Sequence, residues 1–241
     1  MSQQTANRRP VNGNANLDAR RKAMRRKKIM RRKFLLLGIM LVALIAIILG
    51  IVGIVKLITG RFADETTMKI TKDGVITMDE VSDFSGSNYD EDELIKATKE
   101  LATEYNESGK GGKVSYEKAK VKDKIAYLRM EYSDYNAYKN FTGNELFVGT
   151  VGEAKAAGYN FEDTFSEVSD KKKGDAISPE DMRSDDSKKV ILVRGNWKVV
   201  APGKITAVSD SCTTIEDKDA ISIKQPDGNE DATVLTTIMY E

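Results

Sequence analysis

The longest hydrophobic run of the chain extends from Phe34 to Val55 and contains no charged or strongly polar residue. As a helix these 22 residues would be about 33 Å long, which matches the hydrocarbon core of a bilayer. A signal peptide has a shorter apolar stretch followed by small residues, whereas this run continues to Arg61. A helix of a soluble protein keeps a polar face, and this run has none. The pattern therefore predicts a retained transmembrane signal anchor at residues 34–58.

Beyond residue 66 the apolar residues recur with the shorter periods of strands and amphipathic helices. Two short strands are expected around Asp73 and Gly74, a dipeptide favoured in tight hairpin turns. A helix is expected from Asp90 to Tyr105. Two further strands, at 113–121 and 124–132, alternate apolar and polar residues, which is typical of a sheet with one side on the core.

The predicted helix at 90–105 places Leu94, Thr98, Leu101 and Tyr105 on one face. Asp90 with Glu93 three residues later resembles a capping box in which Asp replaces Ser or Thr. We therefore expect these acids to stabilise the helix start, and the two leucines and the tyrosine to be buried.

Tyr135, Tyr138 and Phe141 follow at intervals of three. This spacing favours a short helix with one buried face, while an aromatic platform for a glycan or peptide is the functional alternative. Thr150 and Glu153 predict a second capping box, in a helix that ends near Gly158. The following stretch, 160–188, is polar and predicts a long surface excursion with one weak helical turn.

The C-terminal third is rich in strand patterns. It contains the apolar run "KKVILVR", a return through Pro202 and Gly203, and two strands on either side of the turn "PDGNED". Trp197 is expected at the sheet edge. The sequence as a whole predicts a single transmembrane helix plus an extracytoplasmic α+β domain, with an antiparallel sheet that has helices on one face.

Charge divides the chain in the same places. Residues 1–33 carry twelve Lys/Arg and one acid, a net charge of +11, whereas residues 62–241 carry 24 basic and 36 acidic residues, a net charge of −12. Basic residues beside a membrane span favour the cytoplasmic side. The predicted organisation is therefore a basic, disordered cytoplasmic tail (1–33), the anchor (34–58), a linker (59–66) and an extracellular domain (67–241).

The residue types exclude several chemistries. Histidine is absent and Cys212 is the single cysteine, so Ser-His-Asp and Cys-His catalysis, the usual zinc sites and an internal disulfide are excluded. Cys212 is expected to be a small, partly buried residue. Gly149 and Gly152 fit no phosphate-binding loop, and the acidic turn 227–231 does not fit an EF-hand. The sequence thus assigns no catalytic, cofactor-binding or metal-binding residue, and its ligand-binding residues are unknown.

Four segments carry a resemblance to a known group: "DGVITMDEVSDF…YDEDELIKATKELATEYN", "LFVGTVGEAKAAGY", "APGKITAVS" and the final "IMYE". They resemble uncharacterised cell-surface lipoproteins and membrane-anchored proteins of clostridial Gram-positive bacteria, over most of Met68 to Tyr240. The group has no established activity, so the resemblance implies no site. It implies an extracytoplasmic location, with a retained helix in place of an acylated cysteine.

Two functions of different class follow. The first is a non-enzymatic binding or interaction module at the cell surface, whose partners are the lipid bilayer and a cell-wall or surface protein. Its basic tail can attract anionic lipid headgroups, while nucleic acid is not expected because no aromatic residue interrupts the basic block. The second is a carboxylate-based hydrolase acting on cell-wall glycan, since paired Asp and Glu can provide acid and base without histidine.

Overall fold

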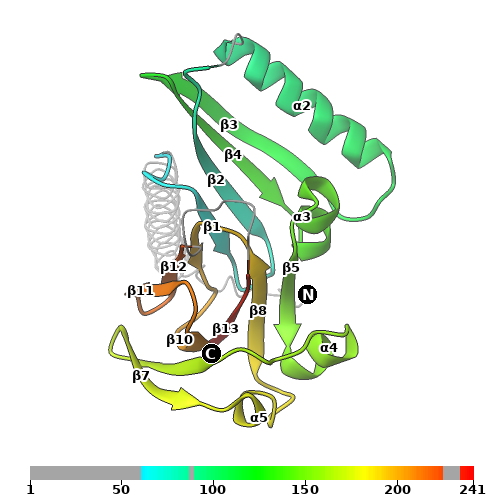
Figure 1. Ribbon diagram of the computed structural model, residues 1–241. Helices are drawn as coiled ribbons and strands as arrows, with labels where there is room; N and C mark the ends of the chain where they lie inside the picture. Colours follow the sequence, from blue (N-terminus) through cyan, green and yellow to red (C-terminus); the bar gives the residue numbers. More distant parts are fainter. Residues whose placement is uncertain (1–60, 87–89, 225–233) are drawn as a thin grey trace, which may run out of the picture. The chain divides into compact units, whose positions relative to one another are not determined.

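A computed structural model of the chain describes residues 61–86, 90–224 and 234–241 (Figure 1). The chain divides into two units, 1–61 and 62–241, and the described elements belong to the second. They are thirteen strands in two sheets and four helices.

The larger sheet, called sheet A, has seven strands in the order β11-β12-β9-β1-β2-β4-β3. Their bounds are β1 (Thr67–Ile70), β2 (Ile76–Asp83), β3 (Val114–Lys122), β4 (Ile125–Tyr132), β9 (Lys198–Val200), β11 (Thr213–Asp217) and β12 (Ala220–Ile223). Sheet B has six strands in the order β5-β8-β13-β10-β6-β7. Their bounds are β5 (Leu146–Thr150), β6 (Phe165–Ser169), β7 (Lys172–Ile177), β8 (Lys189–Arg194), β10 (Ile205–Ser209) and β13 (Leu235–Tyr240).

The helices are α2 (Glu91–Glu107), α3 (Tyr135–Thr142), α4 (Val151–Ala156) and α5 (Pro179–Met182). The capping boxes expected at Asp90 and Thr150 are both present. The short helix around Tyr138 is also confirmed, and it ends at Gly143, whose positive φ of 77° suits a glycine.

Helix α2 lies along β3, the edge strand of sheet A (Figure 1). The side chain of Asn106 bonds both the N–H and the C=O of Val114, at 2.9 and 2.8 Å, and Glu91 accepts the N–H of Val121 at 2.8 Å. The helix therefore satisfies backbone groups at both ends of an edge that would otherwise be open to pairing with another strand.

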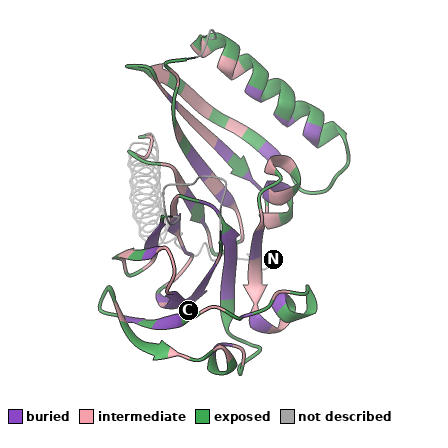
Figure 2. Cartoon of the chain, viewed as in Figure 1, coloured by how far each residue is buried: buried purple, intermediate pink, exposed green. Residues whose placement is uncertain are grey.

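The central strands of sheet B, β8, β13 and β10, are buried on both faces. One face packs against sheet A in a core that includes Ile191, Val193 and Ile238. The other face, which includes Val190, Leu192 and Met239, packs with α4, α5 and Phe161 in a second core. Strand β8 is consequently buried over four consecutive residues (Figure 2).

The predicted fold class is wrong in its sheet architecture. The structure is mostly β, with two sheets instead of one, and sheet A is mixed because β1 pairs with β9 in parallel. The physical reason lies in the "KVILVR" strand, because an uninterrupted apolar run is the pattern of a strand covered on both sides. A sheet with helices on one face would show alternation there.

Two local expectations are also corrected. Leu101 is 56% exposed, so the buried face of α2 consists of Thr98, Ala102 and Tyr105. The stretch 160–188 is not one surface excursion, because it contains β6 and β7 as well as α5. Strand β7 is polar because it is the exposed edge of sheet B.

The membrane predictions receive no support. Among the described residues, no helix has the length and apolar character needed to span a bilayer. The expected anchor at 34–58 and the basic tail at 1–33 lie outside those residues, as does the acidic turn 227–231. The predictions of a transmembrane helix, a single-pass protein and an extracytoplasmic location are therefore corrected.

Candidate functional site

A cavity of about 550 Å³ lies on the side of sheet B that α5 covers. We call it the sheet B pocket. It is lined by residues of β6, β7, β10 and β13, by α5, and by Ser187 to Lys189 at the start of β8. Its volume is in the range of small-molecule sites in proteins.

Two irregularities in strand pairing meet at this pocket. Ile205 lies opposite Tyr240 and Ala207 opposite Met239, so Thr206 is an extra residue on β10. Between β6 and β7 the register also shifts beside Glu167. Both Thr206 and Glu167 line the pocket. Because bulges re-aim side chains and are frequent beside functional sites, this coincidence marks the pocket as the strongest candidate site.

The floor of the pocket is apolar and fixed. Met182, Ala207 and Met239 are at most 3% exposed and belong to the second core. Side chains held in a close-packed core cannot move without disturbing their neighbours. The floor therefore presents a preformed apolar surface to a ligand.

Charges of both signs line the walls. The acids are Glu167, Asp181 and Glu241, and the bases are Lys188 and Lys189. The Lys189 ammonium lies 6.0 Å from the centre of the Tyr240 ring, within the distance of a cation–π contact. Burial raises the pKa of Tyr240, so its hydroxyl stays protonated at neutral pH and can donate a hydrogen bond.

Helix α5 is held in place by its own cap. The Ser178 hydroxyl accepts the N–H of Asp181 at 3.1 Å and donates to the Asp181 carboxylate at 2.8 Å. Pro179 occupies the first turn, where its fixed φ suits a helix start. The cap orients Asp181 before any ligand arrives.

The arrangement suits binding better than metal chemistry. Within the ranges that the structure describes, no three His, Cys, Asp or Glu side chains are grouped so that they could hold a metal ion. What the pocket offers is an apolar floor, carboxylate acceptors, ammonium donors and one phenol. These groups fit a small ligand that carries both charges and an apolar part.

The residues that the sequence singled out lie elsewhere. Tyr138 is buried edge-on against Tyr132, with ring centres 5.1 Å apart, and Phe141 packs against Tyr105 at 5.6 Å, so the aromatic-platform reading is wrong. Cys212 is half-buried with a φ of 68° in the turn between β10 and β11. Gly149 and Gly152 belong to β5 and α4.

Sequence analysis missed Glu167, Asp181 and Lys188 because they lie in the polar stretch 160–188. A signal was present in part: Ser178 followed by Pro179 and Asp181 is the pattern of a capped helix start. The bulge at Thr206 left no such signal, since "KITAVS" reads as an ordinary strand.

Comparison of the chain with protein-family models, with curated proteins and with solved structures gives no significant match.

Proposed function

We propose that this chain is a non-catalytic binding module that holds a small, peptide-like ligand in the sheet B pocket. The observation that carries the proposal is the meeting of two register shifts at a cavity with a fixed apolar floor and a rim of both charges. A peptide fits this chemistry because it combines an ammonium or guanidinium group, a carboxylate and an apolar side chain.

The charged side chains of the pocket walls set the orientation in which the ligand binds. Glu167, Asp181 and Glu241 can accept hydrogen bonds from its cationic group, while Lys188 and Lys189 can donate to its carboxylate. Its apolar side chain then covers Ala207 and Met239, which adds about 25 cal/mol for each Å² removed from water.

The test is a titration of the full-length chain with the tripeptide Lys-Leu-Glu, followed by calorimetry. A tripeptide Gln-Leu-Gln with blocked ends serves as the uncharged control ligand. Ala207→Phe fills the pocket floor and should weaken binding at least about tenfold, or about 1.4 kcal/mol. The same substitution at the exposed Ala97 on α2 should leave binding unchanged.

A second variant avoids any effect on the core. Glu167 is exposed, so Glu167→Gln removes a charge without disturbing the packing. It should weaken Lys-Leu-Glu several-fold and leave the blocked control peptide unaffected. Equal affinities of wild type, Ala207→Phe and Glu167→Gln for Lys-Leu-Glu would refute the pocket as its site.

One observation favours the hydrolase as a second candidate: Glu167 and Asp181 line the same pocket. Two carboxylates in one cleft can act as acid and base or nucleophile on a glycosidic bond. Incubation with soluble peptidoglycan fragments separates the two functions. Release of new reducing ends by wild type but not by Asp181→Asn would favour the hydrolase, whereas binding without turnover favours the module.

A further inference from the structure

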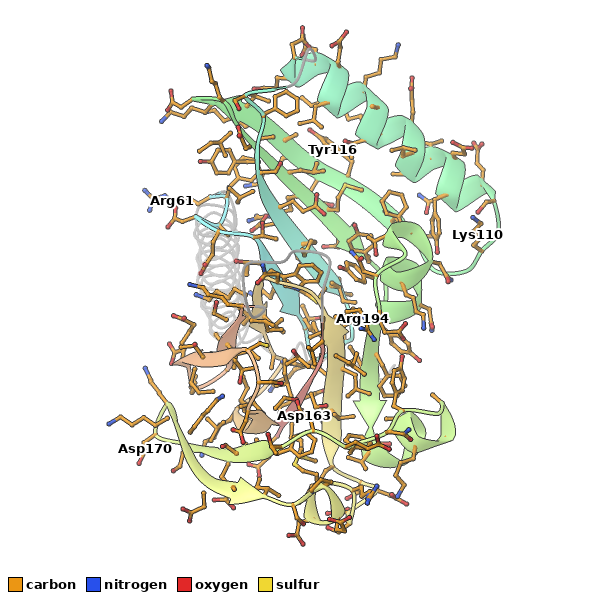
Figure 3. All side chains as sticks on the ribbon, in the orientation of Figure 1. Arg61, Lys110, Tyr116, Asp163, Asp170 and Arg194 are labelled. Atoms are coloured by element: carbon orange, nitrogen blue, oxygen red, sulfur yellow. The ribbon has the colours of Figure 1, made fainter. Side chains whose placement is uncertain are left out.

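A partly uncovered side of sheet A lies next to helix α2 and takes no part in the proposed function. The helix packs on β3, and Tyr116 lies between that strand and the helix, with the Lys99 ammonium 4.9 Å from its ring centre (Figure 3). Met130 of β4 is opposite Tyr116 in the register. Alternate residues of a strand share a face, so Leu128 also lies on this inner side of the β3–β4 hairpin.

Strand β2 extends the inner side beyond the helix. Glu80 is directly opposite Leu128, and residues that are opposite in an antiparallel pair share a face. Glu80 and Ser82 are exposed, and Leu128 is only half-buried. The helix therefore covers the edge strand β3 and leaves this part of β2 and β4 open.

The helical spacing shows which residues of α2 border the open area. The residues of α2 that are buried share one face: Thr98, Ala102 and Tyr105. Asn106, which bonds the edge strand, shares one flank of the helix with Lys99, seven residues earlier. Leu94 and Leu101 are also seven residues apart and lie on the opposite flank. They therefore border the open part of β4 and β2.

We call the area formed by Leu94, Leu101, Leu128 and Glu80 the Leu101 surface. Leu101 is 56% exposed, and a single exposed leucine is ordinary on a protein. Here, however, the half-buried Leu94 and Leu128 border the same open area. Contiguous apolar surface with a polar rim is a common mark of a protein–protein contact.

The helix makes the rim of this surface acidic. Residues 91–107 contain six acids and two lysines, a net charge of −4. Glu93 and Glu104 lie eight residues before and three residues after Leu101, so both acids share its flank. Both are exposed.

The lysines of this region lie away from that flank. Lys96 forms an ion pair with Glu100 at 4.0 Å, and Lys99 is on the flank that faces the edge of β3. Lys110 and Lys113 follow in the loop after the helix, beyond the C-terminal end of the acidic flank.

The sheet adds one more acid. Glu80 forms no ion pair with any Lys or Arg of the described ranges. The lysines of β3 from Lys118 onwards lie on the outer side of the hairpin, interleaved with acids of β2 and β4. Asp123 and Lys124 at the hairpin tip add no net charge. The Leu101 surface is therefore acidic, and a cationic partner supplies the missing opposite charge.

The dimensions of the open area suit a helix. Packed helices have axes about 8–10 Å apart, and this distance is about two strand spacings of about 4.8 Å. A helix placed beside α2 therefore lies over β2, two strands from β3. Leu94 and Leu101 are separated by two helical turns, about 10 Å, which is also the repeat of an apolar stripe on a partner helix.

Charge selects among such helices. The α2 helix of a second copy has leucines at the right spacing but brings the same acids, so like charges would meet. We propose that the Leu101 surface binds a basic amphipathic helix of a partner protein, with its apolar stripe on the three leucines and its cations beside Glu80 and Glu104.

The test uses the full-length chain and two peptides of Leu and Lys that have the same composition and the same length, about four helical turns. In one peptide Leu recurs with helical spacing, so that its helix has one apolar face. In the other the order is scrambled, so that no face is apolar. Binding is measured by fluorescence anisotropy of the labelled peptide, at low and at physiological salt.

The first variants test the apolar contact. Leu101→Gln should weaken the amphipathic peptide at least about tenfold, whereas the scrambled peptide should bind weakly to every variant. Val234→Gln is the matched control, because Val234 is 41% exposed and lies outside the Leu101 surface. It should change the affinity less than about twofold. Neither side chain belongs to a core, so both variants keep the fold.

The second variants test the charges. Glu80→Gln/Glu104→Gln keeps the leucines and should weaken the amphipathic peptide several-fold at low salt, and less at physiological salt. The matched control, Glu107→Gln/Glu131→Gln, removes the same charge from exposed positions on the solvent side of α2 and the outer side of β4. It should change the affinity less than about twofold.

Three results would overturn the inference. Equal losses in Leu101→Gln and Val234→Gln, or equal affinity for the two peptides, would reduce binding to general stickiness. A dimer that sedimentation detects and that Leu101→Gln dissociates would assign the surface to a second copy. A titration of the wild type without saturable binding of the amphipathic peptide would refute the surface as a site for such a helix.

Discussion

The sheet B pocket and the outer side of the β3–β4 hairpin both combine charge with apolar surface, but in different ways. The pocket sets charges of both signs around a floor that a core fixes, whereas the outer side of the hairpin interleaves lysines and Arg129 with Asp79, Asp83 and Glu131 on an open side of sheet A. A balanced rim in a cavity discriminates among small ligands by geometry. Ion pairs and interleaved charges on an open surface are screened by water and salt, so they contribute little to stability.

The two regions also differ in the packing beneath them. Truncating a side chain of the second core tests this difference. Leu192 is fully buried in the second core, beside the pocket floor, so Leu192→Ala should lower the free energy of unfolding by about 2–5 kcal/mol. Urea denaturation followed by the fluorescence of Trp197, the single tryptophan, measures it.

Leu101→Ala on α2 is the matched control. Because that side chain is 56% exposed, its loss should stay within about 0.5 kcal/mol. Equal losses at the two positions would mean that the side chain of Leu101 is covered in solution, and the contrast between the regions would fail.

The next largest change in stability is expected at the ion pair between Arg129 and Asp79, which lies beside Phe62. Arg129→Met leaves the Asp79 carboxylate largely buried without its partner, so it should cost about 1–3 kcal/mol. The double variant Asp79→Leu/Arg129→Met replaces both charges by apolar groups and should recover most of that loss. A double variant as unstable as the single one would show that the guanidinium acts through packing on Phe62 instead.

A smaller loss of stability is expected at the contact between α2 and the edge strand β3. Asn106→Ala removes two hydrogen bonds to Val114 and should cost about 1 kcal/mol. Hydrogen exchange should show the Val114 amide to be the group most affected. Asn136→Ala, at an exposed position of α3, should stay within about 0.5 kcal/mol.

The local elements were largely predictable from the sequence. Capping residues act within four positions, so the helix starts at Asp90 and Thr150 followed from spacing alone. The hairpin at Asp73 and Gly74 followed from the need for positive φ, and the glycine has a φ of 82°. Such features depend on neighbours in the chain and need no tertiary information.

The features that failed depend on tertiary context. Leu101 fits the apolar spacing of α2. In the structure, however, α2 is oriented so that Asn106 contacts the edge strand β3, and this orientation leaves Leu101 exposed at the side of the helix. The pocket joins Glu167, Asp181 and Thr206 through a strand order that local patterns do not contain. The alternating lysines of β3 are visible in the sequence, but only the strand register shows that Asp79, Asp83 and Glu131 lie on the same side of the sheet.

The smallest predicted change in stability concerns Glu80, the neighbour of Asp79 on β2. The two acids occupy opposite faces of the strand, and Asp79 has a guanidinium partner. Glu80 remains exposed to solvent, but neighbouring protein atoms displace part of the water around its carboxylate and raise its pKa. Its charge also helps to raise the pKa of Tyr138, which burial brings to about 12.

A raised carboxyl pKa means that the folded state binds the proton more tightly than the unfolded state. Ionised Glu80 therefore opposes folding: the penalty is absent below the unfolded pKa and complete above the folded pKa. Glu80→Gln removes it, so the variant should melt at a higher temperature than wild type at pH 7, and the difference should vanish near pH 4.

Glu117→Gln on β3 removes a charge from an exposed position and should produce no such pH-dependent difference. A spectrophotometric titration of the tyrosines gives an independent check, because Tyr138 should ionise at a lower pH once the nearby charge is gone. If Glu80→Gln instead melted at a lower temperature than wild type at pH 7, the ionised carboxylate would have a stabilising partner, and Glu80 would resemble Asp79.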